Sequence, residues 1–148
     1  MNRKYFTVEE ANDSLVLVKP IVKDIVLKRK KMIETKEKLN TITNDRRLYI
    51  SKKHIALNWI LSTNDIKKEY KRLKSEMRCI SRDITYNLEE LEMIGCYLKD
   101  FEIGVIDFPS VLDRRVVFLS WQLGEKTVNN WHEVVHSYDK NKVIKSLT

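Results

Sequence analysis

Two long runs of apolar residues, spaced alternately three and four positions apart, constrain this fold more than any other feature of the chain. The first run lies between residues 7 and 40, and the second lies between residues 63 and 94. This spacing puts the apolar side chains on one face of an α-helix. The sequence therefore predicts two long helices that pair as an antiparallel, coiled-coil-like hairpin. The seam positions are Val8, Ala11, Leu15, Val18, Val22, Ile25, Met32 and Leu39, followed by Ile66, Tyr70, Leu73, Met77, Ile80, Ile84, Leu91 and Ile94.

Local signals mark the expected ends of these helices. Thr7 and Glu10 have the spacing of a capping box, in which each side chain bonds the backbone N–H of the other residue. Gly95 is the expected stop of the second helix, because glycine readily adopts the left-handed conformation that ends helices. Between the helices, Thr41–Asp45 is expected to form a turn. The apolar segment Ile55–Leu61 is expected to form a short helix at the hairpin tip.

The period of the apolar pattern changes to two after residue 95, which indicates β-strands. Pro109-Ser110 and Leu112-Asp113 are expected to form turns between the strands. A small antiparallel sheet packed on the hairpin base follows, so the predicted fold class is α+β. The expected strands are Cys96–Leu98, Val105–Phe108 and Arg115–Trp121.

The chain length of 148 residues is typical of a single domain, predicted here as residues 1–148. Within it, the hairpin occupies residues 7–94, and the β region with its tail occupies residues 95–148. The net charge of +7 comes from residues 1–94, which carry 21 Lys and Arg against 14 Asp and Glu. Contact with a polyanion is one reading of this surplus, and a solvated helix surface is the other.

Three features of the sequence predict a cytoplasmic protein that does not enter membranes. Cys79 and Cys96 do not form a Cys-x-x-Cys motif and are expected to be reduced thiols. No segment approaches the ~20 consecutive apolar residues that span a bilayer, and no apolar signal core follows the N-terminus.

Several blocks of the chain resemble one prokaryotic family, the domain-of-unknown-function family number twenty-two hundred and three. Residues 5–12 look like its opening, Y-F-T-x-E-E-A-N. Residues 104–109 look like its G-x-x-D-F-P block, residues 121–125 like its W-x-L-G-E block, and Trp131-His132 like its W-H pair. The resemblance implies a shared fold and a candidate surface, and it brings no known activity. This chain has Arg114 where the family tends to have glycine in a hairpin turn.

His132-Glu133-Val134-Val135-His136 spells the zinc-peptidase string H-E-x-x-H. On a helix, His132 and His136 would share a face and bind zinc, and Glu133 would polarise a water molecule. Such an enzyme needs a third ligand, and only 12 residues follow His136. A metal-dependent hydrolase with zinc as its cofactor is therefore the alternative rather than the preferred interpretation.

A second candidate site combines polar side chains with an aromatic rim. Asp107 interrupts an apolar strand, where it either faces solvent or caps a turn. It would otherwise join a ligand site able to hold a metal or a small cation. The members of that site would be Asp100, Asp107, Glu125, Trp131 and His132.

The sequence as a whole favours a non-catalytic interaction or assembly module. A homodimer is expected, because the two seams offer more apolar surface than one hairpin contact buries. A nucleic-acid-associated module is the second alternative. It would use the run of basic residues at 28–31 and the face that carries Lys67, Lys71 and Lys74. The sequence specifies no protein partner and no ligand.

Overall fold

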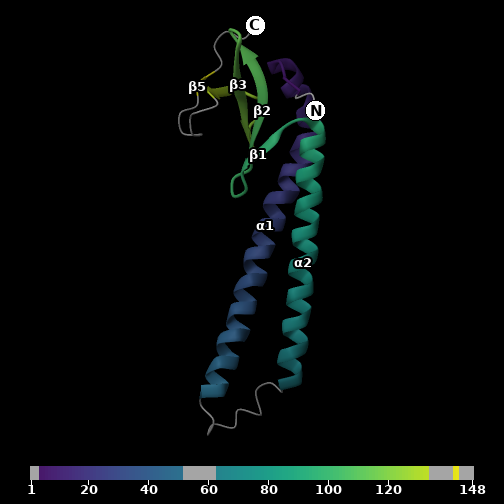
Figure 1. The fold of residues 1–148 in the computed structure, drawn as a ribbon, viewed down its shortest axis with the longest axis vertical. Helices are drawn as coiled ribbons and strands as arrows, with labels where there is room; N and C mark the ends of the chain where they lie inside the picture. The colour runs from purple at the N-terminus through teal and green to yellow at the C-terminus, as the bar shows by residue number, and fades with distance from the viewer. Residues whose placement is uncertain (1–3, 52–62, 134–141, 144–148) are drawn as a thin grey trace. The chain divides into compact units, whose positions relative to one another are not determined.

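The computed structural model describes residues 4–51, 63–133 and 142–143. Within these residues, two helices precede five strands, which confirms the predicted α+β class. The helices α1 (Val8–Ser51) and α2 (Thr63–Ile94) form the antiparallel hairpin shown in Figure 1. The tip segment Ile55–Leu61 and the tail residue His136 lie outside the described residues.

The predicted capping box begins α1. The Glu10 backbone N–H donates to Thr7 Oγ1 at 3.0 Å, and the Thr7 backbone N–H donates to Glu10 Oε1 at 3.2 Å. These two bonds satisfy amides that the first helical turn leaves without intrahelical partners. The predicted turn at Thr41–Asp45 is wrong, because α1 continues through it to Ser51.

The end of α2 agrees with the prediction for Gly95. This glycine has a φ of +108°, and its N–H donates to the Leu91 carbonyl at 3.0 Å. The following residue, Cys96, donates its N–H to the same carbonyl at 3.1 Å. These two hydrogen bonds to one carbonyl, at a glycine in the left-handed conformation, end the helix and direct the chain into the sheet.

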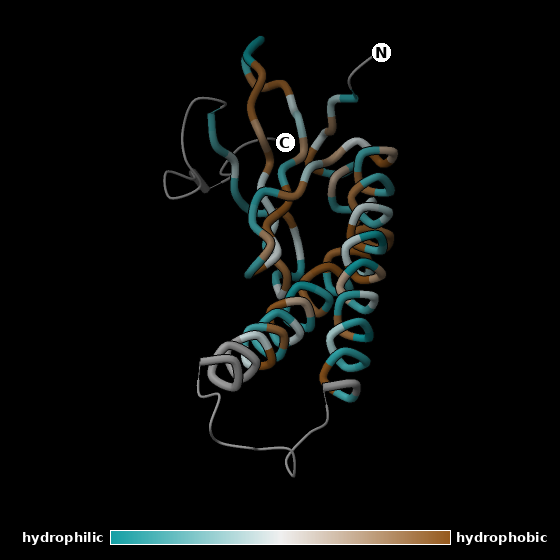
Figure 2. Tube along the Cα trace, turned by 60° about the horizontal axis from the view of Figure 1, so that its bottom comes forward, coloured by the Kyte–Doolittle hydropathy of each residue, from teal (hydrophilic) through white to brown (hydrophobic). Residues whose placement is uncertain are grey.

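The seam residues of the two helices form much of the hydrophobic core, and Figure 2 shows hydrophobic and hydrophilic residues alternating along both helices. Asn87 lies between the seam residues Ile84 and Leu91 of α2 and is a buried polar residue. Its Nδ2 donates to Asp24 Oδ2 at 3.1 Å, which pairs the two helices through a specific polar contact. The buried seam side chains are Ala11, Leu15, Val18, Val22, Ile25, Leu39, Leu73, Ile80, Ile84 and Leu91.

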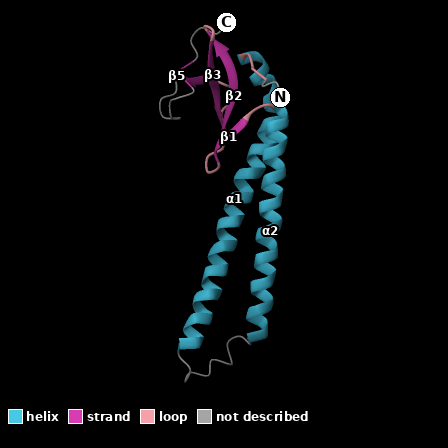
Figure 3. Cartoon of the chain, in the orientation of Figure 1, coloured by secondary structure: helices cyan, strands magenta, loops and turns pink. Residues whose placement is uncertain are grey.

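The strands, drawn in magenta in Figure 3, form one antiparallel sheet in the order β1-β2-β3-β4-β5. Each strand therefore pairs with its neighbour in sequence. Asp113 and Arg114 connect β2 to β3 with φ values of 50° and 64°. Arg114 thus occupies a left-handed position that favours glycine. The bounds are β1 Tyr97–Asp100, β2 Val105–Leu112, β3 Arg115–Gln122, β4 Asn130–Glu133 and β5 Lys142–Val143.

The predicted turn at Pro109-Ser110 is also wrong, because both residues belong to β2. Pro109 lies beyond the part of β2 that pairs with β1. Its carbonyl accepts from the Phe6 N–H at 2.7 Å, on the side of the strand opposite to β3. Since N and O of one residue point to the same side, the missing proline N–H leaves the β2–β3 ladder intact.

The chain divides into two compact units. Unit 1 comprises residues 1–27 and 85–148, and unit 2 comprises residues 28–84. In unit 1, the sheet is fixed to the start of α1 by Phe6, whose ring meets Phe108 edge-on at 5.1 Å. Asn12 Oδ1 accepts from the Val128 N–H at 2.7 Å and adds a second tie. Neither helix, over the residues described, has a stretch long and apolar enough to cross a bilayer.

Candidate functional site

Asp107 and His132 lie on strands that are not neighbours but project from the same face of the sheet. In the register of the sheet, Asp107 on β2 is opposite Ser120 on β3, and His132 on β4 is opposite Phe118 on β3. Cross-strand partners share a face, and residues two apart on one strand share a face as well. The two side chains therefore meet over β3.

This contact is short and excluded from water. His132 Nε2 and Asp107 Oδ1 are 3.0 Å apart, and their side chains are only 1% and 3% exposed. The other ring nitrogen of His132, Nδ1, lies 3.0 Å from the Glu133 carbonyl oxygen. The Phe118 ring lies 5.5 Å from the imidazole, centroid to centroid. Both nitrogens of the ring are thus engaged.

The hydrogen-bond pattern fixes how many protons the pair holds. A carbonyl oxygen only accepts, so Nδ1 must carry a hydrogen and donate it to Glu133. A neutral imidazole then accepts at Nε2 from a protonated Asp107, while an imidazolium donates at Nε2 to an ionised Asp107. Both arrangements contain the same number of protons and have no net charge. This neutrality suits a buried site, where a net charge is costly.

The pKa of Asp107 agrees with this arrangement. Burial raises the pKa of this carboxyl above its ordinary value, and the hydrogen bond and charge of His132 oppose the rise without cancelling it. Desolvation disfavours the charged form of a carboxyl, and a positive neighbour favours it. The prediction that Asp107 either faces solvent or caps a turn is therefore wrong, because the side chain is buried inside the sheet region.

The other predicted members of the polar site serve local turns. Asp100 Oδ1 accepts from the N–H groups of Glu102 and Ile103 at 2.8 and 3.1 Å, within the turn after β1. Glu125 Oε1 accepts from the Gln122 N–H at 2.6 Å in the turn after β3. The structure brings Asp107 and His132 together, and it gives Asp100 and Glu125 separate roles. Trp131 is half-buried and lies opposite Leu119 in the β3–β4 register.

The described part of the H-E-x-x-H string, His132-Glu133, is extended rather than helical. His132 and Glu133 belong to β4, so adjacent side chains point to opposite faces. Glu133 Oε1 lies 3.6 Å from Arg115 Nη1 on β3. Within the described parts of the chain, no three His, Cys, Asp or Glu side chains gather in a way that could hold a metal ion.

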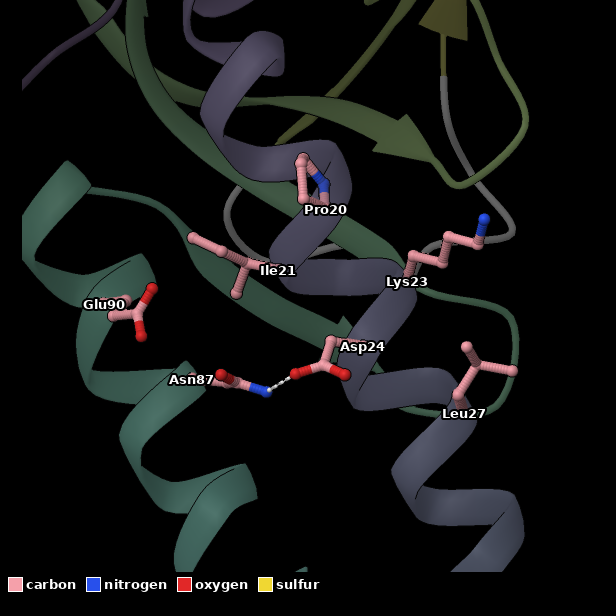
Figure 4. Close-up of a pocket in the computed structure, with 7 residues that line it drawn as sticks. All are labelled: Pro20, Ile21, Lys23, Asp24, Leu27, Asn87 and Glu90. Atoms are coloured by element: carbon pink, nitrogen blue, oxygen red, sulfur yellow. Dashed lines mark hydrogen bonds between the residues drawn. The ribbon is translucent and has the colours of Figure 1, made fainter.

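A groove between α1 and α2 in unit 1 is a second candidate site, and sequence reasoning missed it. It has a volume of about 490 Å³ and lies beside the Asn87–Asp24 hydrogen bond, as Figure 4 shows. Glu90 borders it from α2, and Lys23 lies on the α1 side. Its lining residues are Pro20, Ile21, Lys23, Asp24, Leu27, Asn87 and Glu90.

An adjoining apolar depression of about 470 Å³ extends this groove along the same two helices. It shares Pro20, Ile21 and Glu90 with the groove and adds Val16, Leu17, Met93 and Ile94. Val16 is 79% exposed, Leu17 is 62% exposed and Met93 is 87% exposed. We call Val16, Leu17, Leu27 and Met93, all exposed, together with the half-buried Ile21, the apolar strip.

The apolar strip had a signal in the sequence. Between Leu15 and Leu27, α1 is apolar on its seam face and also on the opposite face, where Val16 and Leu17 lie. An exposed apolar face on the side of a helix away from its seam is typical of an interaction surface. The seam pattern accounts for one face and says nothing of the other.

Comparison with known proteins places the chain in a family. The family model described as Uncharacterized conserved protein (DUF2203) matches residues 4–144. The chain belongs to the DUF2203 family. No curated protein matches it, and no solved structure does.

The residues that carry the family resemblance hold the sheet of this DUF2203 protein together. Beyond the Phe6, Asn12 and Asp107 contacts described above, Trp121 Nε1 donates to the Glu125 carbonyl at 2.9 Å. Gly104 has a φ of +74°, and a Cβ there would lie 2.8 Å from Val22 Cγ1. The family-like blocks therefore have structural roles in unit 1.

Proposed function

We propose that this DUF2203 protein is a non-catalytic assembly module that forms a homodimer through the apolar strip. The observation that carries the proposal is the exposure of Val16, Leu17 and Met93 around one continuous groove. Contiguous exposed apolar surface of this kind marks interaction sites in soluble proteins. The seam, which first suggested a dimer, is largely buried within the chain, so the proposal rests on the strip instead.

The charges beside the strip support a second copy of the chain as the occupant. Lys23 and Glu90 border the groove on its α1 and α2 sides, and both are exposed. In a two-fold dimer, each residue of the patch meets the patch of the other copy in the reverse direction. A two-fold axis near Ile21 would bring Lys23 of one copy toward Glu90 of the other, twice. The strip is thus complementary to itself in both polarity and charge.

The hydrogen bonding of the polar candidate-site residues supports a role without catalysis. Asp107 and His132 bind each other out of contact with water, and Asp100 and Glu125 bind backbone N–H groups in turns. A general base needs access to a substrate proton. The bonding of these side chains favours structural roles.

The proposed setting is the prokaryotic cytoplasm, with coiled-coil-like pairing of the helices. Cys79 is exposed and Cys96 is buried, and neither is in a disulfide. Burial raises the pKa of the Cys96 thiol to about 12, which keeps it protonated and unreactive. An exposed free thiol such as Cys79 is characteristic of a reducing compartment.

Light scattering during size-exclusion chromatography tests the dimer. The parent at micromolar concentration is expected to elute with twice the chain mass of 17.7 kDa. Leu17→Lys and Met93→Lys should each shift it to the monomer mass, because a lysine in the apolar strip would be desolvated in the interface. Val111→Lys is the matched control, since Val111 is 53% exposed at the end of β2, away from the strip. A monomeric parent, or equal behaviour of the strip and control variants, would overturn the proposal.

Charge reversal tests the two-fold arrangement itself. Lys23→Glu and Glu90→Lys should each weaken the dimer, because each places like charges together across the interface. The double variant should restore it. Failure of the double variant to recover the dimer would contradict the pairing even if the protein is dimeric.

A further inference from the structure

An exposed side of α2 in unit 2 carries a line of basic side chains with a single sign of charge. Lys67, Lys71, Lys74 and Arg78 follow one another at steps of four, three and four residues, and all four are exposed. With 3.6 residues per turn, they fall within an arc of about 60° on the helix. We call these four residues the basic stripe.

The acidic residues of this part of α2 occupy another side of the helix and already have partners. Arg72 Nη2 lies 2.6 Å from Glu69 Oε1, and Arg72 Nη1 lies 3.4 Å from Glu76 Oε2. Lys31 Nζ on α1 lies 3.5 Å from Glu76 Oε1. The carboxylates interleaved in the sequence are therefore neutralised by Arg72 and Lys31, outside the basic stripe. Among the described residues, none of the ion pairs includes a member of the stripe.

The charge of the whole chain is divided in the same way. Unit 2, residues 28–84, contains 17 Lys and Arg against 7 Asp and Glu, a net charge of +10. Unit 1, which is the rest of the chain, contains 11 against 14, a net charge of −3. The surplus of +7 thus conceals a larger separation of charge. Such a separation directs a polyanion to one unit.

We propose that the basic stripe binds the phosphate backbone of a double-stranded nucleic acid. At a rise of 1.5 Å per residue, its charges are spaced about 4.5 to 6 Å apart over roughly 17 Å of helix. This is a span over which several phosphates can be contacted from one side of a duplex. The stripe offers charge without a base-reading group, so the contacts are independent of sequence.

The residues around the stripe distinguish a duplex from two other polyanions. A membrane-bound helix pairs its basic residues with an apolar face that enters the lipid. The stripe has Ser75 on one side and Tyr70, which is 40% exposed, on the other, whereas Leu73 and Ile80 are buried in the core. A single aromatic ring is less than the apolar face that such a helix inserts into lipid. Single strands are held by aromatic side chains that stack on bases. Among the described residues, Tyr70 lies beside the stripe, and the Lys74 ammonium is placed over its ring at 5.6 Å.

Fluorescence anisotropy with a labelled duplex of arbitrary sequence, titrated across a series of KCl concentrations, tests the proposal. The logarithm of the binding constant should fall with the logarithm of salt concentration at a slope of about −3 to −4, for about four phosphates contacted. Lys71→Gln with Arg78→Gln should reduce the magnitude of the slope by about 2 and weaken binding at least tenfold. Lys71→Arg should retain both. All these positions are exposed, and unchanged melting temperatures would confirm intact folding.

The matched control removes two charges elsewhere. Lys99→Gln with Lys126→Gln lowers the net charge equally, at exposed positions of unit 1, and should leave the slope unchanged. Equal weakening by the control would overturn the proposal, because only total charge would then matter. The proposal is also overturned if the parent does not bind the duplex, or if it binds phosphatidylserine vesicles or a single strand more tightly than the duplex.

Discussion

The carboxyl of Asp107 and the imidazole of His132 meet across β3 with their Oδ1 and Nε2 atoms 3.0 Å apart. The contact joins β2 to β4, which do not pair directly. Because His132 Nδ1 must donate to the Glu133 carbonyl, one proton is held between the two side chains. The pair therefore links β2 to β4 in unit 1 through a buried contact that has no net charge.

Substitution of Asp107 should separate the role of its proton from the role of its shape. Asp107→Asn resembles the protonated acid, because its amide N–H can donate to Nε2 of a neutral imidazole. We expect its free energy of unfolding to lie within about 1 kcal/mol of the parent. Asp107→Leu leaves Nε2 buried without a partner and should cost about 1–3 kcal/mol. Urea denaturation measures both, and equal losses would contradict the proposed proton arrangement.

The pH dependence of stability should follow the same proton. Because burial raises the pKa of Asp107, the folded chain binds this proton more tightly than the unfolded chain does. The stabilisation is fully present below the ordinary value of 3.8 and is lost as the pH rises through the folded pKa. The stability of the parent relative to Asp107→Asn should therefore fall as the pH rises from about 4. Urea midpoints of both proteins across pH 4–8 measure the difference in stability between them. A difference that stays constant over this pH range would refute the prediction.

Two glycines provide a matched test of packing at the base of the sheet. Gly104 and Gly124 both have positive φ, so alanine strains the backbone at each. At Gly104 the added Cβ would also lie 2.8 Å from Val22 Cγ1 and 3.1 Å from Leu123 Cβ, whereas at Gly124 nothing lies within 4 Å. Gly104→Ala should therefore be the more destabilising, by about 1–3 kcal/mol, as for other overpacked cores. Equal melting temperatures would mean that the Val22 side chain can move away from the added Cβ without loss of stability.

The helical seam can be probed at two nearby positions that differ in burial. Ile80 is 7% exposed, while Met77 is half-buried. Ile80→Asp places an unpaired carboxylate in the core and should cost several kcal/mol, comparable with the stability of the fold. Met77→Asp can reach solvent and should cost less. Thermal melts followed by circular dichroism compare them, and a reversed order would contradict the seam.

The sequence predicted those parts of the fold that depend on local signals. The capping box at Thr7 and the stop at Gly95 are formed by neighbouring residues, so their spacing was sufficient. The turn predicted at Thr41–Asp45 failed because threonine hydroxyls have a helical alternative. Thr41 Oγ1 donates to the Glu37 carbonyl at 3.0 Å, and Thr43 Oγ1 donates to the Leu39 carbonyl at 2.9 Å. These bonds satisfy the polar side chains within the helix.

The candidate site was less predictable because its contacts depend on tertiary structure. Asp107 and His132 were both singled out, but their burial follows from strand register that no local pattern encodes. Asp100 and Glu125 were expected to join them, and each instead satisfies backbone N–H groups in its own turn. Acidic side chains in tight turns often take this role. The apolar strip was missed because a seam pattern describes only the face that the partner helix covers.

His132 and His136 should respond differently to substitution. His132→Ala removes both hydrogen bonds of a buried ring and leaves Asp107 and the Glu133 carbonyl without their partner, at a cost of about 3 kcal/mol or more. His136 lies beyond the Trp131-His132 pair and outside the described residues, and we expect His136→Ala to be tolerated. A zinc site would instead make the two variants equivalent, because loss of either ligand empties it. Elemental analysis for zinc and melting temperatures of the parent and both variants decide between these outcomes. Stoichiometric zinc that is lost equally from both variants would favour the hydrolase over the assembly module.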